Sequence, residues 1–240
     1  PLSRIVLAIL FIAPVIALHN IFSFVVLDNL QGPWLNLIQY TETIMTIILI
    51  FIAYSFYTKK IENRKALELS TKKWFTEFAT GFSIGGGTVI LIVLILVLFG
   101  FYKTNGLNSP FTLVERIFRY GIGSFVEEIF FTLIIFKLIE EFAGTIISMV
   151  FVSLLFGAMH LGNDNASIWN SIFMALEHVF ILAPFILTRR IWMVWAIHFS
   201  WNYFQTGVFG MNNSGMEHTG YIQPAISGPN WATGGNFGIE

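Results

Sequence analysis

The segment FATGFSIGGGTVILIVLILVLFGF, residues 78–101, contains no charged side chain from one end to the other. As a helix it is long enough to cross the hydrocarbon core of a bilayer, which takes about 20 apolar residues. The rest of the chain has a similar composition, because 55% of its 240 residues are hydrophobic and only 11% are charged. Its mean hydropathy is +0.73. We therefore expect an all-α integral membrane protein.

Similar apolar stretches lie on both sides of this segment. They predict a polytopic bundle of about seven transmembrane helices, followed by an irregular tail rich in Gly, Asn, Ser and Pro from residue 210 onward. Small residues four apart at the start of segment 78–101 predict close helix packing there; they are Gly81, Gly85, Gly86 and Gly87. The predicted helices cover residues 5–27, 37–57, 78–101, 117–139, 145–160, 168–187 and 191–209.

The positive charges are unevenly placed along the chain. They gather in residues 59–73, between the second and third predicted helices, and no Lys or Arg follows Arg190. Loops rich in Lys and Arg stay in the cytoplasm, so we predict an inside amino terminus and an outside tail. Residues 59–73 are predicted to form an amphipathic helix on anionic lipid. The net charge of −1 gives no reason to expect a nucleic-acid partner, and the absence of cysteine excludes disulfides and thiolate nucleophiles.

Three of the predicted helices carry polar side chains that lipid disfavours. The fourth contains the adjacent Glu127 and Glu128, and the fifth ends at His160. The seventh contains His198 and Asn202, which are four residues apart and share a helix face. Singly, these features have ordinary explanations: acids at a helix end, a capping histidine, and a hydrogen bond between helices.

Together, the order EExxxx, FxxxH and HxxxN on successive hydrophobic helices resembles the CAAX protease and bacteriocin-processing family, also called CPBP or Abi. These are intramembrane endopeptidases that include the prenyl-protein endopeptidases. The resemblance extends to LFGAMHLGN at 155–163, to TRRIW at 188–192 and to TGGNFG at 233–238. It divides the chain into a three-span region with the basic loop, 1–110, and a catalytic core with the tail, 111–240. It implies a peptide or protein substrate at the membrane and a bacterial plasma-membrane location.

The resemblance also implies a mechanism. Glu127, braced by Glu128, and His160 would activate a water for attack on a peptide carbonyl, while His198 and Asn202 would stabilise the oxyanion. No cofactor is firmly indicated. A zinc ion on Glu127, His160 and His198 is the alternative, since two histidines and one carboxylate form a familiar catalytic set.

One departure from the family pattern affects the first motif. The family's box is usually EExxxR, and Thr132 occupies the arginine position. Threonine cannot neutralise a carboxylate, so we expect Glu128 to be protonated or bonded to another helix. The departure motivates an alternative function, a catalytically impaired membrane scaffold or regulator. Intramembrane acids and histidines also suggest a proton-coupled transporter, although the repeated halves typical of transporters are missing.

Two further polar groups lie near these motifs in the sequence. Glu177 and His178 in the sixth predicted helix have no counterpart in the three boxes. We expect them to give structural support, either by completing a polar network or by replacing the bracing role of the missing arginine. Ser124 lacks a following glycine, so packing is expected of it rather than nucleophilic attack. By helix counting, His160 falls near the outer end of its helix and His198 nearer the inner half of its own. A tilted or shorter fifth helix is therefore needed to bring them together.

Overall fold

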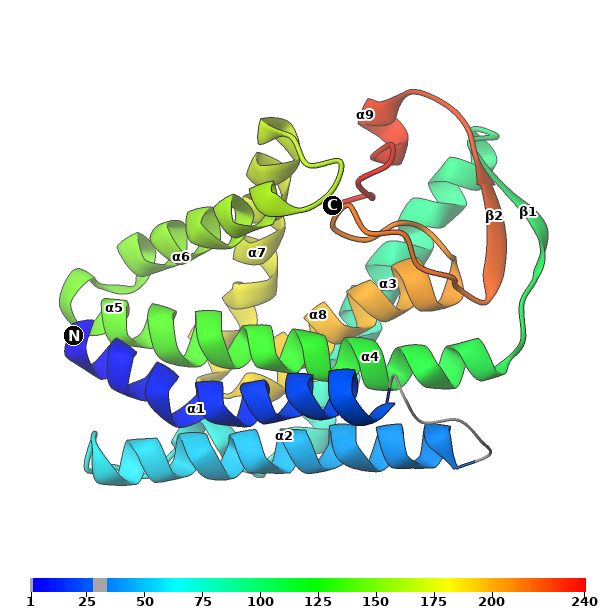
Figure 1. Cartoon of the computed structure of the whole chain (residues 1–240). Helices are drawn as coiled ribbons and strands as arrows, with labels where there is room; N and C mark the ends of the chain where they lie inside the picture. The colour runs from blue at the N-terminus through cyan, green and yellow to red at the C-terminus, as the bar shows by residue number, and fades with distance from the viewer. Residues whose placement is uncertain (1, 28–33) are drawn as a thin grey trace.

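The computed structural model describes residues 2–27 and 34–240 as an all-α bundle with one small sheet (Figure 1). The helices are mostly continuous apolar stretches, as expected of segments that satisfy their own backbone in lipid. The elements are α1 (Leu2–Phe22), π-helix η1 (Ser23–Leu27), α2 (Leu35–Lys60), 3₁₀-helix η2 (Leu67–Leu69), α3 (Trp74–Leu98), β1 (Tyr102–Leu107), α4 (Phe111–Glu128), π-helix η3 (Ile129–Phe136), α5 (Lys137–Ala143), α6 (Thr145–Met159), 3₁₀-helix η4 (His160–Gly162), α7 (Ile168–Thr188), α8 (Ile191–Asn202), π-helix η5 (Tyr203–Val208), β2 (Ile222–Ile226) and α9 (Asn230–Thr233).

Helix α8 lies in the middle of the bundle. It packs against α3, α4 and α7, and nearly all of its side chains are buried. Figure 1 shows α1 and α2 side by side on one side of α4, with α6 and α7 on the other. The helix with the histidine and asparagine is therefore surrounded by protein rather than lipid, which removes much of the cost of its polar groups.

The predicted membrane helices are all helical in the structure. Five described helices are long and apolar enough to cross a membrane: Leu2–Val25, Leu35–Lys60, Trp74–Leu98, Thr145–Gly162 and Ile168–Thr188. The predicted spans 117–139 and 191–209 are also helical, as α4–η3–α5 and as α8–η5. The prediction of an all-α membrane bundle is confirmed, whereas seven crossings and the 1–110 and 111–240 division stay predictions.

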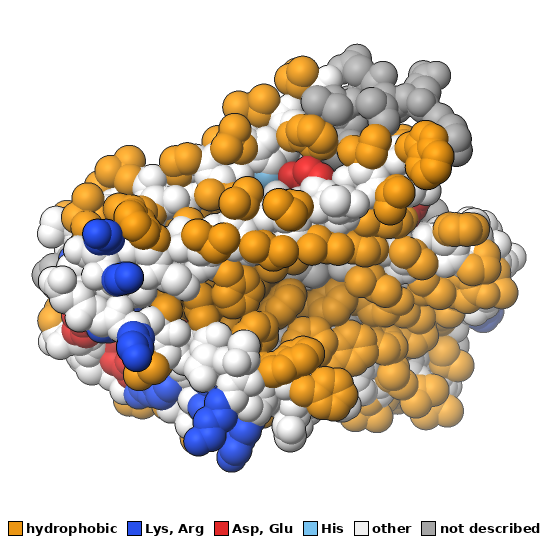
Figure 2. All heavy atoms as spheres, turned by 90° about the horizontal axis from the view of Figure 1, so that it is seen from below, with side chains coloured by type: hydrophobic (Ala, Val, Ile, Leu, Met, Phe, Trp, Pro, Cys, Tyr) orange, Lys and Arg blue, Asp and Glu red, His pale blue; other side chains and the backbone are white. Residues whose placement is uncertain are grey.

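Hydrophobic side chains cover the face formed by α1 and α2, whereas Lys and Arg gather at one end (Figure 2). Many of the apolar residues on this face are exposed, Leu10, Leu18 and Ile52 among them. An exposed apolar face of this extent suits contact with lipid chains. The inside or outside location of the basic end remains a prediction.

The glycines at the start of α3 do pack against another helix. A methyl group on Gly81 would overlap the backbone of Met193, and one on Gly85 would overlap the carbonyl oxygen of Ile197 and the hydroxyl of Ser200. Gly87 differs, because the space beside it is open. Small residues therefore let α3 approach α8 closely, as the sequence predicted for this motif.

Replacing Gly85 with Ala is expected to destabilise the protein by about 1–3 kcal/mol, because α3 and α8 must move apart. The same change at Gly87 is the matched control. The added methyl group meets no neighbour. Because the change removes a helical glycine, it is expected to raise the free energy of unfolding by about 0.5–1 kcal/mol. Equilibrium unfolding in mixed detergent micelles measures both. Equal effects of the two changes would contradict close packing at Gly85.

The prediction of an amphipathic helix over 59–73 is wrong. Helix α2 ends at Lys60, and the residues that follow form a turn, a loop and the short η2. The reason is a set of ion pairs that draw the loop against the helix ends. Glu62 pairs with Arg4 and Arg64, and Glu68 pairs with Arg64 and Lys137.

Glu68 shows how strongly this loop is held. Burial alone would raise the pKa of Glu68, but the cations of Lys137 and Arg64 together lower it below its ordinary value. A charged, buried carboxylate with two cations needs a fixed backbone, and a surface helix would carry Glu68 away from Lys137. Tertiary ion pairs thus override the local helix preference of residues 61–73.

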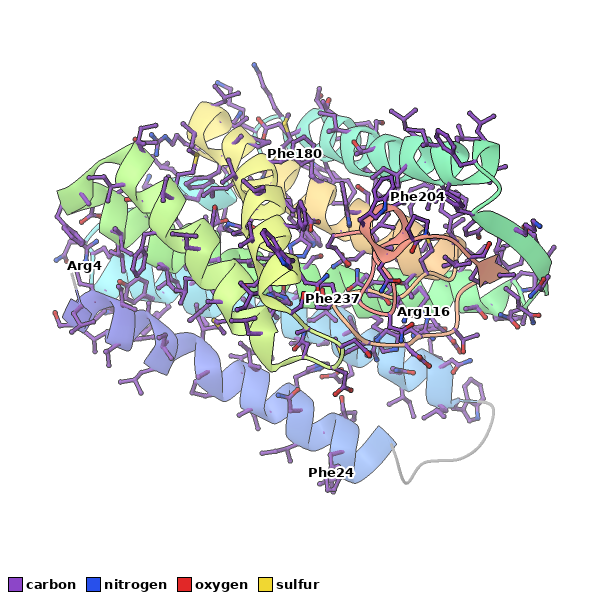
Figure 3. The ribbon with its side chains drawn as sticks, turned by 90° about the horizontal axis from the view of Figure 1, so that it is seen from above. Arg4, Phe24, Arg116, Phe180, Phe204 and Phe237 are labelled. Atoms are coloured by element: carbon purple, nitrogen blue, oxygen red, sulfur yellow. The ribbon has the colours of Figure 1, made fainter. Side chains whose placement is uncertain are left out.

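The tail contains more regular structure than predicted. β2 pairs with β1 in an antiparallel ladder, with Tyr102 opposite Ile226 and Leu107 opposite Ile222. The short helix α9 follows β2, and the chain then turns inward, so that Phe237 is buried in the main core. Figure 3 shows Phe237 beneath α7, near the centre of the molecule, whereas Phe24 points away from the bundle. The tail therefore forms part of the wall around the centre.

Candidate active site

The motif side chains from separate helices line one cavity of about 260 Å³. Glu127 comes from the last turn of α4, His160 from η4, and His198 and Asn202 from α8. Asn163, the asparagine that follows the second motif, lies on the same wall. The difference in depth that the sequence implied between His160 and His198 does not keep them apart.

The local geometry of α6 explains this convergence. The helix is short, and His160 begins a tighter 3₁₀ turn rather than continuing α6. Gly157 lets α6 touch α7 at the carbonyl of Ser171, where a side chain would not fit. Close packing of α6 on α7 and the 3₁₀ turn at His160 accompany the placement of this histidine in the cavity. The tilted or shorter fifth helix stays a prediction, since α6 has nearly the predicted bounds.

The helices of the first and third motifs change geometry next to their functional side chains. The π-helix η3 begins at Ile129, after Glu128, and the π-helix η5 begins at Tyr203, after Asn202. π-helical segments are rare and occur frequently at functional sites, because the wider turn redirects side chains. The sequence offered no sign of either segment.

Glu128 lies behind the cavity and is fully buried. Its Oε1 accepts a hydrogen bond from Nδ1 of His198 at 2.7 Å, and its Oε2 accepts one from the hydroxyl of Thr132 at 2.6 Å. The prediction that Glu128 bonds to another helix is confirmed. Thr132, in the position of the family's arginine, serves this carboxylate as a hydrogen-bond donor.

His198 lies between the two glutamates. Its Nε2 is 3.5 Å from Oε2 of Glu127, on the side of the ring opposite Glu128. Because both ring nitrogens face carboxylate oxygens, both can donate. Glu127 has the more exposed side chain, at 39% against 0% for Glu128. The adjacent glutamates therefore differ in position: Glu127 faces the cavity and Glu128 holds the histidine.

His160 and Asn202 each use one polar atom on the protein and keep the other free. Nδ1 of His160 donates to the carbonyl oxygen of Phe156 at 2.7 Å, which leaves Nε2 as the acceptor of the neutral ring. Oδ1 of Asn202 accepts from the amide of Asn213 at 2.9 Å, which leaves the Asn202 amide to donate. One acceptor and one donor are thus oriented by the surrounding structure.

Replacing Thr132 with Val is expected to destabilise the protein by about 1–3 kcal/mol, because one oxygen of the buried Glu128 loses its donor. Cleavage is also expected to slow, since the carboxylate that holds His198 becomes less well fixed. Thr88→Val is the matched control, because the Thr88 hydroxyl only bonds back to Ile84 of its own helix. The free energy of unfolding and the rate of product formation are measured for both variants. Equal changes in Thr132→Val and Thr88→Val would contradict the role of Thr132.

The zinc alternative does not fit this arrangement. With Nδ1 of His198 bonded to Glu128 and Nδ1 of His160 bonded to a carbonyl, an ion would have to bind the two Nε2 atoms. The spacing of the side chains is what does not suit an ion. Across residues 2–27 and 34–240, no three His, Asp or Glu side chains lie close enough together to hold one ion.

Several residues of the cavity wall were missed by sequence reasoning. Asn213, Ser214, Met216 and Glu240 come from the tail, and Asn163 donates to the carbonyl of Ser214 at 2.9 Å. Their polar character was visible in the sequence, but nothing local showed that the tail folds back over α8. Glu177 was noticed, yet it was expected only to give structural support.

His178 has a different environment from its neighbour Glu177. It is fully buried, its Nδ1 lies 3.1 Å from the hydroxyl of Ser153, and its ring stacks on Phe156. It makes no hydrogen bond to Glu128, so it does not replace the missing arginine. Ser124 bonds to the carbonyl of Tyr120 in its own helix, which agrees with a packing role.

A second cavity of about 650 Å³ adjoins the first. The two share four lining residues: Glu127, Asn202, Asn213 and Met216. Its other walls come from α1, α2 and α4, and its lining includes Arg116 and Arg119, which contact Thr219 and His218 of the tail. Glu127 is therefore reachable from a larger space between the first two helices and α4.

Comparison with known families gives one match. Residues 109–204 match the family described as Rce1-like, type II CAAX prenyl endopeptidase Rce1-like. The matched region contains Glu127, Glu128, His160, His198 and Asn202. Searches of curated proteins and of solved structures found no match.

Proposed function

We propose that this chain, whose residues 109–204 match the family described as type II CAAX prenyl endopeptidase Rce1-like, is an active intramembrane endopeptidase. It hydrolyses a peptide bond with a water that Glu127 and His160 activate. The observation that carries the proposal is the single cavity lined by Glu127, His160, His198 and Asn202. The basic end of the bundle faces the cytoplasm of a bacterial cell, and the tail lies outside.

The first step is attack by water. The free Nε2 of His160 positions a water beside the carboxylate of Glu127, which removes a proton as the oxygen bonds to the peptide carbonyl carbon. A positioned base of this kind contributes about a hundredfold to ten-thousandfold in rate. Glu128 does not touch the substrate in this scheme. It is a positioning residue that fixes the orientation of His198.

The second element is stabilisation of the negative charge on the carbonyl oxygen. Nε2–H of His198 and the free amide of Asn202 are the two donors, since these residues share one helix face and both line the cavity. Donors fixed before the reaction stabilise this charge without reorganising during it. The hydrogen bonds from Asn213 and to Glu128 keep both donors in place.

The substrate reaches Glu127 through the larger cavity. Its walls combine polar groups of α1, α2 and α4 with the apolar side chains of Phe118, Ile122 and Met216, so an extended peptide attached to a lipid-soluble group fits its chemistry. A membrane location and a peptide substrate follow from the family. The preference for sequence and for a prenyl group is part of the proposal.

The test is a cleavage assay with purified protein in proteoliposomes. The substrates are membrane-anchored reporter peptides, each made with and without a prenylated cysteine. Defined peptide fragments detected by mass spectrometry are the expected result. A folded wild-type protein that cleaves none of the reporters would support the scaffold alternative, and proton flux without cleavage would support the transporter.

A further inference from the structure

Glu177 is an acid inside the membrane bundle that the mechanism above does not use. It belongs to α7, where it and His178 are the only ionisable side chains. It lines the same cavity as Glu127 and His198. An ionisable residue inside a membrane bundle is costly and is by default a candidate functional group.

The other acids held inside the bundle have partners. Glu128 bonds to His198 and Thr132, Glu77 pairs with Arg190, and Glu42 bonds to His19. In the described part of the chain, Glu177 makes no ion pair and no hydrogen bond, and its Oε2 is buried without a partner. A structural role would be expected to show in such contacts, so support of the fold does not explain this side chain.

Its surroundings suit the neutral acid better than the carboxylate. The titratable groups that face it are Glu127 of α4, His160 of η4, His198 of α8 and Glu240 of the tail. Two of these are carboxyl groups, and the cation that could balance a charge, His198, is already between Glu127 and Glu128. Carboxyl groups that share a site do not ionise equally, and unequal environments divide them into an acid and a base.

We propose that Glu177 is the general acid of the reaction and protonates the leaving amine. This assignment rests on the proposed endopeptidase function. After water has added to the carbonyl carbon, the C–N bond breaks and its electron pair goes to the nitrogen. The nitrogen takes the proton of the Glu177 carboxyl group, and Glu127 holds the proton taken from water. Transfer of that proton through water in the cavity to Glu177 restores both groups.

The position of Glu177 agrees with this division of roles. Glu127 reaches the cavity from α4 and Glu177 from α7, two separate helices. A peptide bond held between the two side chains would have the attacking water near Glu127 and the proton donor near Glu177. His178 cannot take this role, because it is fully buried and does not line the cavity.

The test compares two substrates that differ only in the leaving group. One is a reporter peptide with a normal scissile amide. The other carries an ester of a nitrophenol at the same position, whose leaving group departs as an anion and needs no proton. Glu177→Gln is expected to slow amide cleavage by about a hundredfold or more while leaving ester cleavage close to wild type. The ester rate also reports whether the variant is folded.

The controls separate this inference from the proposed function. Glu217→Gln makes the same chemical change at an exposed position of the tail that does not line the cavity, and it should leave both rates unchanged. Equal slowing of amide and ester by Glu177→Gln, or no slowing of either, would overturn the role of Glu177. In either case, loss of both reactions in Glu127→Gln would still support the proposed endopeptidase, because amide and ester cleavage both need the water that Glu127 activates. Unchanged rates in that variant would contradict Glu127 as the base, and a folded wild-type protein that cleaves neither substrate would contradict the endopeptidase itself.

Discussion

Replacing Glu127 with Gln is expected to reduce peptide cleavage by about a hundredfold to ten-thousandfold. Gln has the same shape and can still contact Nε2 of His198, which lies 3.5 Å from the Glu127 carboxylate. It cannot accept a proton from water. The loss should therefore lie in kcat, with little change in folding, since the Glu127 side chain is partly exposed to the cavity.

Initial rates of fragment release from the reporter peptide measure this effect. Thermal unfolding of the same samples checks that the variant is folded. A Glu127→Gln variant that retains wild-type cleavage would contradict the assigned base. Strong loss of cleavage together with loss of the folded protein would indicate that Glu127 supports the bundle instead.

The second large effect is expected at Asn202. Asn202→Asp keeps the size of the side chain and the oxygen that accepts from Asn213. It removes the amide donor and places a negative charge where negative charge develops in the reaction. Loss of one such donor lowers kcat by about 10²–10³-fold in well-studied hydrolases. Because the new carboxylate also repels the developing negative charge, the expected loss lies at the upper end of this range.

Two variants of neighbouring asparagines make this prediction sharper. Asn213→Ala removes the group that orients Asn202, so a smaller decrease in kcat is expected. Asn212→Asp is the matched control, because the Asn212 side chain only bonds to the carbonyl of Asn236 and does not line the cavity. If Asn212→Asp and Asn202→Asp reduced kcat equally, the added charge rather than the lost donor would be responsible.

Thr132 looked like a defect when only the sequence was considered. The arginine of the usual motif would offer several donors and a positive charge, whereas threonine offers one hydroxyl. In the structure, that hydroxyl serves one oxygen of Glu128 and His198 serves the other. The carboxylate is thus fully engaged without an arginine, and this favours an active enzyme over the scaffold alternative.

The sequence by itself determined the membrane class and the identity of the motif residues. Both depend on local properties: an uninterrupted apolar length in residues 78–101, and side chains four apart that must share a helix face. The packing glycines could be found for the same reason, since Gly81 and Gly85 lie four apart on α3. Such patterns do not depend on which other segments the chain later meets.

Only the tertiary structure decided which groups meet. The pair of Glu128 with His198 and the bond from Asn213 to Asn202 join segments whose approach no local pattern encodes. The ion pair of Glu68 with Lys137 likewise overrides a helix that charge patterning alone predicted over 59–73. The role of Glu177 follows in the same way. Its residue type was visible in the sequence, but its lack of a partner and its place in the same cavity as Glu127 depend on how α4, α7, α8 and the tail enclose that cavity.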